Sequence, residues 1–175
     1  MNCPIFFASR TGNTKLLAQT LADALSKENP TQLINADACQ KLPEFPEDTT
    51  YFIGFWTDKG DCSPAIQAVL QSLKNRKVFL FGTAGFGQSQ DYFNKILTNV
   101  SSHLPAGNTV IGSFMCQGKM PENVRARYEK MLEAKPEDPM IQSFIQNFDA
   151  ALSHPDQTDQ DRLVQAMMDS LHSIR

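Results

Sequence analysis

The sequence lacks the features that mark several large classes of protein. Its four cysteines form no C-x-x-C pair, which argues against zinc, iron–sulfur and disulfide frameworks. The net charge of −3 at pH 7 leaves no basic footprint for nucleic acid or a membrane surface. No apolar run approaches a membrane span, and the N-terminus does not resemble a signal peptide. We therefore expect a cytoplasmic protein that binds no nucleic acid, membrane or metal.

Two common nucleotide-binding motifs are missing as well. No G-x-G-x-x-G is present after the first apolar run, so a dinucleotide pyrophosphate has no obvious binding loop. A Walker loop is excluded because Lys15 lies three residues past Gly12, with no glycine before it at the required spacing. A phosphate site in this chain must therefore be of another kind.

Short apolar runs alternate with helical patterns along the 175 residues. This alternation predicts an α/β fold, a parallel sheet covered by helices on both faces. We expect one domain over 1–175, with a core at about 1–135 and a C-terminal helical extension at about 136–175. The expected strands are 4–8, 31–35, 51–55, 78–82 and 109–115. The expected helices have their apolar faces at 17–25, 66–73 and 93–100, and then cover 121–132, 139–152 and 159–174.

The loop between the first strand and the first helix has the composition of a phosphate site. Ser9, Thr11 and Thr14 offer hydroxyls, Asn13 offers an amide, and Gly12 permits a tight turn. The free N–H groups and the dipole of a helix N-terminus favour an anion. An ordinary helix cap also uses Ser, Thr and Asn, but three hydroxyls around one glycine exceed what a cap needs.

Two further loops are expected at the same sheet edge, because ligands of open parallel sheets bind beyond the carboxyl ends of the strands. The loop 56–61 contains the single tryptophan, Trp56, and the loop 83–88 contains Gly85, Phe86 and Gly87. Trp56 could instead be a core or partner-contact residue, and 83–88 a plain connection. A phosphate site beside aromatic rings nevertheless describes a mononucleotide with a large flat heterocycle, and flavin mononucleotide (FMN) fits that description.

The run Ser9-Arg10-Thr11-Gly12-Asn13-Thr14 resembles the phosphate motif of the flavodoxin family. The resemblance extends over the element order of the whole chain. It implies a five-stranded sheet in the order 2-1-3-4-5 with one non-covalent FMN. The runs 54–60, 81–85, 114–119 and 154–156 resemble a bacterial subgroup of short flavodoxin-like proteins, some of which accompany bilirubin reductases as redox partners.

The resemblance also implies which residues bind the cofactor. Trp56 is expected over one face of the flavin ring, with Phe86 or Tyr92 on the outer face. Gly60 is the candidate for a glycine whose peptide flips when flavin N5 is protonated. The full predicted set is Ser9, Arg10, Thr11, Gly12, Asn13 and Thr14; Phe55, Trp56, Thr57, Asp58, Lys59 and Gly60; and Thr83, Ala84, Gly85, Phe86 and Gly87.

The function implied by the resemblance is an FMN-binding electron carrier with no catalytic residues of its own. It would accept electrons from a reductase and pass them to a partner enzyme, such as a bilin or bilirubin reductase. One alternative is an FMN-dependent NAD(P)H oxidoreductase acting on quinones or similar acceptors. Another is a relative of the same fold that binds no flavin and acts in interaction or regulation.

Overall fold

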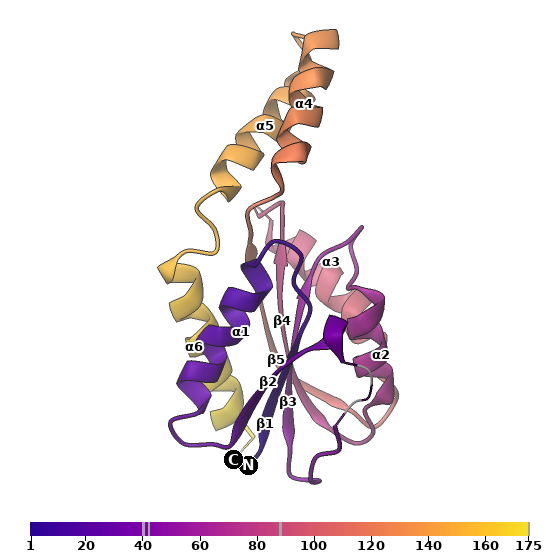
Figure 1. Cartoon of the computed structure of the whole chain (residues 1–175), viewed down its shortest axis with the longest axis vertical. Helices are drawn as coiled ribbons and strands as arrows, with labels where there is room; N and C mark the ends of the chain where they lie inside the picture. The colour runs from indigo at the N-terminus through magenta and orange to yellow at the C-terminus, as the bar shows by residue number, and fades with distance from the viewer. Residues whose placement is uncertain (40, 42, 88, 175) are drawn as a thin grey trace.

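Five parallel strands form a single sheet in the order β2-β1-β3-β4-β5 (Figure 1). The computed structural model describes every residue of the chain except 40, 42, 88 and 175. The strands are β1 (Cys3–Phe7), β2 (Thr31–Asn35), β3 (Thr50–Trp56), β4 (Lys77–Ala84) and β5 (Thr109–Gln117). The α/β fold and the strand order predicted from the sequence are confirmed.

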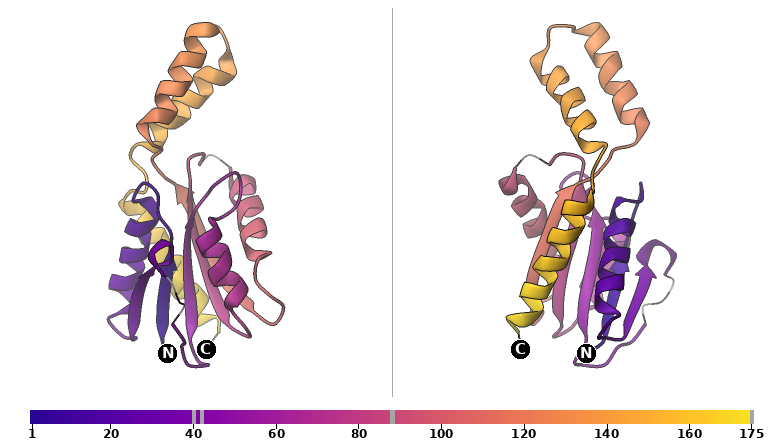
Figure 2. Two further views of the ribbon diagram at one scale, coloured as in Figure 1. Left: turned by 45° about the vertical axis from the view of Figure 1, so that its right-hand side comes forward. Right: turned by 90° about the vertical axis from the view of Figure 1, so that its left-hand side faces the viewer.

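Helices cover both faces of this sheet (Figure 2). On one face, α1 (Asn13–Leu25) and α6 (Gln157–His172) bury Leu17 and Leu163 against the strands. On the other face, α2 (Pro64–Ser72) and α3 (Gln90–Ser101) bury Ile66 and Phe93. A short 3-10 helix, η1 (Ala36–Ala38), lies between β2 and β3. Strands buried on both faces explain why the central runs are almost continuously apolar.

Two helices stand apart from the sheet. α4 (Glu122–Ala134) and α5 (Pro139–Ala151) pack on each other and form a hairpin that rises beyond the carboxyl edge of the strands (Figures 1 and 2). The rings of Tyr128 and Phe144 lie 5.3 Å apart between the two helices. The carboxylate of Asp138 accepts from backbone N–H groups of the first turn of α5 and so fixes the start of that helix.

The helices that belong to the core differ from the expected division into a core at about 1–135 and a C-terminal extension at about 136–175. Met167 and Leu171 of α6 belong to the buried cluster beside α1, so α6 is part of the doubly wound core. α4 and α5, which lie on either side of residue 135, pair with each other. The element outside this core is therefore the hairpin between β5 and α6. An apolar stripe shows that a helix has a buried face but does not identify what buries it.

Among the residues that the structure describes, no helix has both the length and the apolar character needed to cross a membrane.

Glycines inside the sheet make room for aromatic rings, and Gly82 of β4 provides a test of the packing. A Cβ at Gly82 would come within 2.5 Å of Cζ of Phe55, whose side chain is fully buried. Overpacking a core typically costs about 1–3 kcal/mol. We expect Gly82→Ala to lower the free energy of unfolding by about that amount, measured by urea denaturation. In a Phe55→Leu background the same substitution should cost clearly less; an equal cost would mean that the ring contact is not the cause.

Candidate functional site

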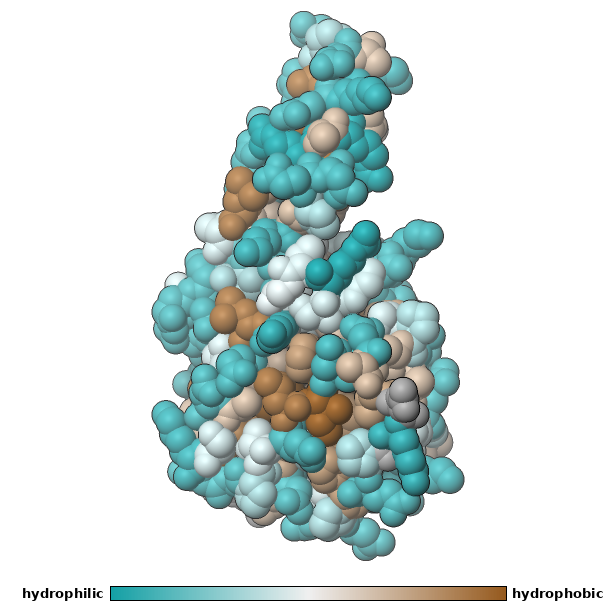
Figure 3. Space-filling view, in the orientation of Figure 1, coloured by the Kyte–Doolittle hydropathy of each residue, from teal (hydrophilic) through white to brown (hydrophobic). Residues whose placement is uncertain are grey.

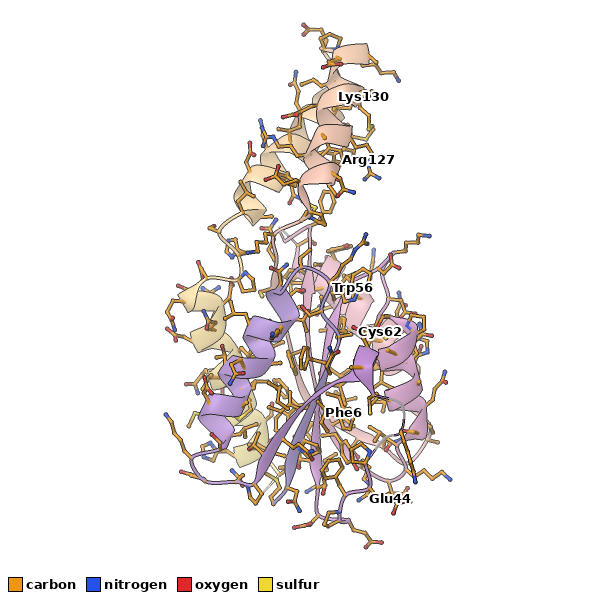
Figure 4. The ribbon with its side chains drawn as sticks, in the orientation of Figure 1. Phe6, Glu44, Trp56, Cys62, Arg127 and Lys130 are labelled. Carbon is orange, nitrogen blue, oxygen red and sulfur yellow. The ribbon has the colours of Figure 1, made fainter. Side chains whose placement is uncertain are left out.

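A cleft of about 790 Å³ lies between the carboxyl edge of the sheet and the hairpin. Figure 4 shows Trp56 at this edge and Arg127 on α4 above it. The three predicted loops meet here, as the parallel sheet led us to expect. The predicted residues that line the cleft are Arg10, Thr11, Asn13, Trp56, Thr57, Asp58, Lys59, Gly60, Thr83, Ala84, Gly85 and Phe86. The lining also includes Tyr92, Gly118, Lys119, Met120, Pro121, Asn123, Val124, Arg127 and Tyr128.

The first loop forms an open helix N-terminus on one side of the cleft. Gly12 is the N-cap of α1 and has a φ of +89°, a backbone conformation that favours glycine. This residue has no side chain with which to cap the helix, and the hydroxyl of Ser9 instead accepts from the N–H of Lys15 at 3.2 Å. The helix dipole and the remaining first-turn donors therefore favour an anion at this point.

Two buried polar atoms at the cleft lack hydrogen-bond partners within the described part of the chain. Asn13 donates from Nδ2 to the carbonyl of Lys119 at 2.9 Å, which leaves its Oδ1 buried and unpaired, and Oγ1 of Thr57 is unpaired as well. A buried polar atom without a partner typically costs about 1–3 kcal/mol. A ligand with polar groups would satisfy both atoms, so the residues present fit a cofactor such as FMN.

Aromatic side chains line the cleft on both the sheet side and the hairpin side. Trp56 is half-buried at the end of β3, and the guanidinium carbon of Arg10 lies 5.6 Å from the centre of its ring. Phe86 packs edge-on against Phe144 of α5, with ring centres 5.9 Å apart. Tyr128 of α4 also reaches the cleft. The sequence reveals Tyr128 only as part of an apolar helical stripe, so its place in the site was missed.

Five predicted residues do not line this cleft. Gly12 lines an adjacent hollow of about 360 Å³ near Leu152 and His154, and Ser9 holds the loop as described. The hydroxyl of Thr14 is buried 3.2 Å from that of Thr83 and ties the first loop to the third. The prediction for Phe55 needs correction, because its ring is packed in the core against Gly82.

The third loop also differs in part from the prediction. Gly87 faces Gln117, so that a Cβ at Gly87 would lie 2.5 Å from the Gln117 Cβ. Gln88 lies outside the described residues. Gly85 remains at the cleft, where a Cβ would press on Sδ of Met120 at 2.6 Å. The backbone of Gly85 therefore approaches the segment that leads into the hairpin.

The second loop ends in a tight turn that is held from both sides. The backbones of Asp58 and Asp61 exchange hydrogen bonds of 2.8 and 3.0 Å, and the two residues between them, Lys59 and Gly60, both have positive φ. The carbonyl of Gly60 accepts from Nδ2 of Asn99 on α3 at 2.9 Å. Asn99 therefore holds the peptide of the glycine that we singled out for a flip.

A histidine and a carboxylate fix the base of this turn. Nε2 of His103 lies 2.9 Å from Oδ2 of Asp61, and the N–H of Cys62 donates to the same carboxylate at 2.7 Å. Burial raises the pKa of Asp61, but hydrogen bonds from His103 and Cys62 outweigh it and leave the pKa lowered. Burial and the charge of Asp61 raise the pKa of the Cys62 thiol to about 12, so it stays protonated near neutral pH.

His103→Ala should raise the pKa of Asp61, because it removes a hydrogen bond to the ionised carboxyl. A lowered folded-state pKa contributes stability above the unfolded value of about 3.9, and that stability is lost as the pH falls through the folded value. The variant should therefore lose this contribution at a higher pH than the parent. The carboxyl ¹³C shift of Asp61 followed through a pH titration measures the change. An unaltered titration would show that His103 does not stabilise the charge.

Comparisons with known proteins agree with this architecture. A family model described as a flavodoxin domain matches residues 4–168. Two curated relatives, each named flavodoxin-like domain-containing protein BilS, are 33% identical in Clostridioides difficile and 36% identical in Clostridium symbiosum. Each comparison covers 91% of this chain and 90% of the relative. A solved flavoprotein from Lactobacillus acidophilus in complex with FMN is 16% identical, with a TM-score of 0.49 over 66% of this chain and 93% of that one. The chain belongs to the flavodoxin domain family.

Proposed function

We propose that this protein carries electrons on FMN from a reductase to a partner enzyme, and that the partner reduces bilins such as bilirubin. The observation that carries the proposal is the cleft itself. It combines an open helix N-terminus at the first loop with aromatic rings at the other two. It lies beyond the carboxyl ends of the neighbouring strands β1 and β3, where the strand order reverses, and such a switch point is where these sheets bind mononucleotides.

Each end of the cleft has residues suited to one end of the cofactor. Thr11, Gly12 and Asn13, together with the N–H groups of the first turn of α1, would hold the phosphate. Trp56 and the Thr57 hydroxyl would contact the ring. Bound FMN supplies the capacity to take up and release electrons. The protein positions the ring and, through the turn fixed by Asn99, holds the backbone carbonyl of Gly60 in place.

The identity of the partner is supported by the resemblance to the bacterial subgroup that accompanies bilirubin reductases. The relatives named BilS cover nearly the whole chain. The runs Gly54–Gly60 and Phe81–Gly85, which carry the resemblance, lie at the ends of β3 and β4 and contribute to the cleft. An electron carrier of this kind needs no substrate pocket beyond its cofactor site.

Purified protein titrated with FMN tests the proposal. We expect shifted flavin absorption bands, quenched flavin fluorescence and one equivalent bound at saturation. A protein that takes up no FMN would refute it. Rapid bleaching by NADH or NADPH alone would instead support an NAD(P)H oxidoreductase. To test the partner, the photoreduced holoprotein is mixed with a purified bilirubin reductase and bilirubin, and bilirubin loss is followed. Loss no faster than with free reduced FMN would rule out this partner.

A further inference from the structure

Positive charge gathers around the cleft although the chain as a whole has a net charge of −3. Among the described residues that line it, Asp58 is the single acid, against four cations. These cations are Arg10, Lys59, Lys119 and Arg127, and all four are exposed. Within the described part of the chain none of the four forms an ion pair. Their charges are therefore available to a partner from outside.

Helix α4 extends this positive charge along the hairpin. Arg127 and Lys130 are three positions apart, so they lie on the same side of the helix. Figure 4 shows both side chains on the outer side of α4, with Arg127 nearer the cleft. Of the acids of the helix, Glu122 and Glu129 lie on a different side, whereas Glu133 follows Lys130 by three positions and lies next to it. We call Arg10, Lys59, Lys119, Arg127 and Lys130 the basic rim.

An exposed apolar residue lines the same cleft as four residues of the basic rim. Phe86 lines the cleft and keeps 38% of its surface exposed, although Phe144 supports its ring from behind. The space-filling view shows the mainly hydrophilic hairpin standing over a notch in the molecule (Figure 3). An exposed aromatic group surrounded by charged side chains is a common arrangement in protein interfaces.

We propose that the notch between α4 and the cofactor loops is the docking surface for an acidic face of the electron-transfer partner. The inference deepens the proposed function and rests on it. Opposite charges on two proteins raise association rates by 10- to 1,000-fold and fix their orientation. Bound phosphate would offset part of the charge near Lys119, whose carbonyl holds Asn13. The charge of Lys59 remains on the loop side of the notch, and the charges of Arg127 and Lys130 remain on the α4 side.

The first test measures binding of poly-L-glutamate, a simple acidic chain, to the FMN-loaded protein at low ionic strength. The test variant is Arg127→Glu with Lys130→Glu. The control is Lys27→Glu with Lys74→Glu, which makes the same change of net charge at two exposed lysines beyond the C-terminal ends of α1 and α2. We expect the test variant to bind at least about 10-fold more weakly than the control. Equal affinities would overturn the proposal.

The second test follows electron release to small acceptors of opposite charge. The photoreduced flavin passes its two electrons to two ferricyanide anions, each of which becomes ferrocyanide, or to two tris(phenanthroline)cobalt(III) cations, each of which becomes the cobalt(II) complex. In both cases the flavin releases its protons to the solvent. FMN affinity is measured first, so that only flavin-saturated variants are compared. We expect the ferricyanide rate to fall as salt is added and to be about 10-fold lower in the test variant. A ferricyanide rate that rises with salt would contradict a basic surface.

The two proposals fail in different ways. A protein that takes up no FMN refutes the electron carrier, and poly-L-glutamate binding to the flavin-free protein still measures the basic rim. A protein that takes up FMN normally but treats both double variants alike keeps its proposed function and loses the acidic partner.

Discussion

The variant Thr11→Val is expected to bind FMN about 10-fold more weakly than the parent while binding riboflavin equally well. The hydroxyl of Thr11 lies at the cleft, 3.5 Å from the carbonyl of Lys119, so the fold depends little on it. A hydrogen bond to a charged group contributes about 1.5–3 kcal/mol, which corresponds to about a tenfold change or more in affinity. Riboflavin has no phosphate, so its affinity for the variant should equal its affinity for the parent. Fluorescence titration with the two flavins measures both affinities.

The control for this prediction is Thr98→Val. Thr98 lies on the exposed side of α3, where, among the residues that the structure describes, its hydroxyl bonds only to the carbonyl of Asn94. The Thr98→Val variant should bind FMN and riboflavin with the same affinities as the parent. If Thr11→Val weakened FMN and riboflavin by the same factor, the first loop would not be the phosphate site.

Replacing Trp56 should weaken both flavins together. Stacking of a planar base on an aromatic side chain contributes about 1–3 kcal/mol, so Trp56→Leu should lower the affinity for FMN and for riboflavin by about 10- to 100-fold. The fluorescence of the bound flavin should also rise, because the quenching indole is gone. Arg10, whose guanidinium lies over this ring, would lose its contact as well. Equilibrium titration and emission intensity at saturation test the two effects.

Phe45→Leu provides the matched aromatic control. Phe45 packs edge-on against Phe6 and Tyr51 and is absent from the cleft lining. We expect normal affinity and normal quenching in this variant. Unchanged quenching in Trp56→Leu would remove the tryptophan from the flavin face.

The sheet and its loops could be predicted because the relevant signals are local. Runs such as Tyr51–Phe55 and the stripe of Ile66, Val69 and Leu70 each specify one element, and a parallel sheet brings the loops after its strands to one edge. Trp56 and Thr11 were predicted in this way, and both line the cleft. Phe55 was misplaced because a position next to a loop does not reveal which face of the strand its side chain occupies.

The rest of the site depends on long-range packing that the sequence does not show. Tyr128 and Arg127 reach the cleft only because α4 stands above it. His103 and Asp61 are far apart along the chain, yet they meet at the base of the second loop. The stripe of α6 looks like that of α5, and only the structure shows that α6 returns to the core.

The two ends of the hairpin insertion meet at a single point. The N–H of Lys119, just before α4, donates to the carbonyl of His154, just after α5, at 2.9 Å. The hairpin therefore begins and ends at this one hydrogen bond, so its length places little constraint on the sheet. A short turn that joined Lys119 directly to His154 would leave the packing of β5 against α6 unchanged. Evolution could thus change the length or the sequence of the hairpin to suit a new partner while the flavodoxin core below it kept its cofactor.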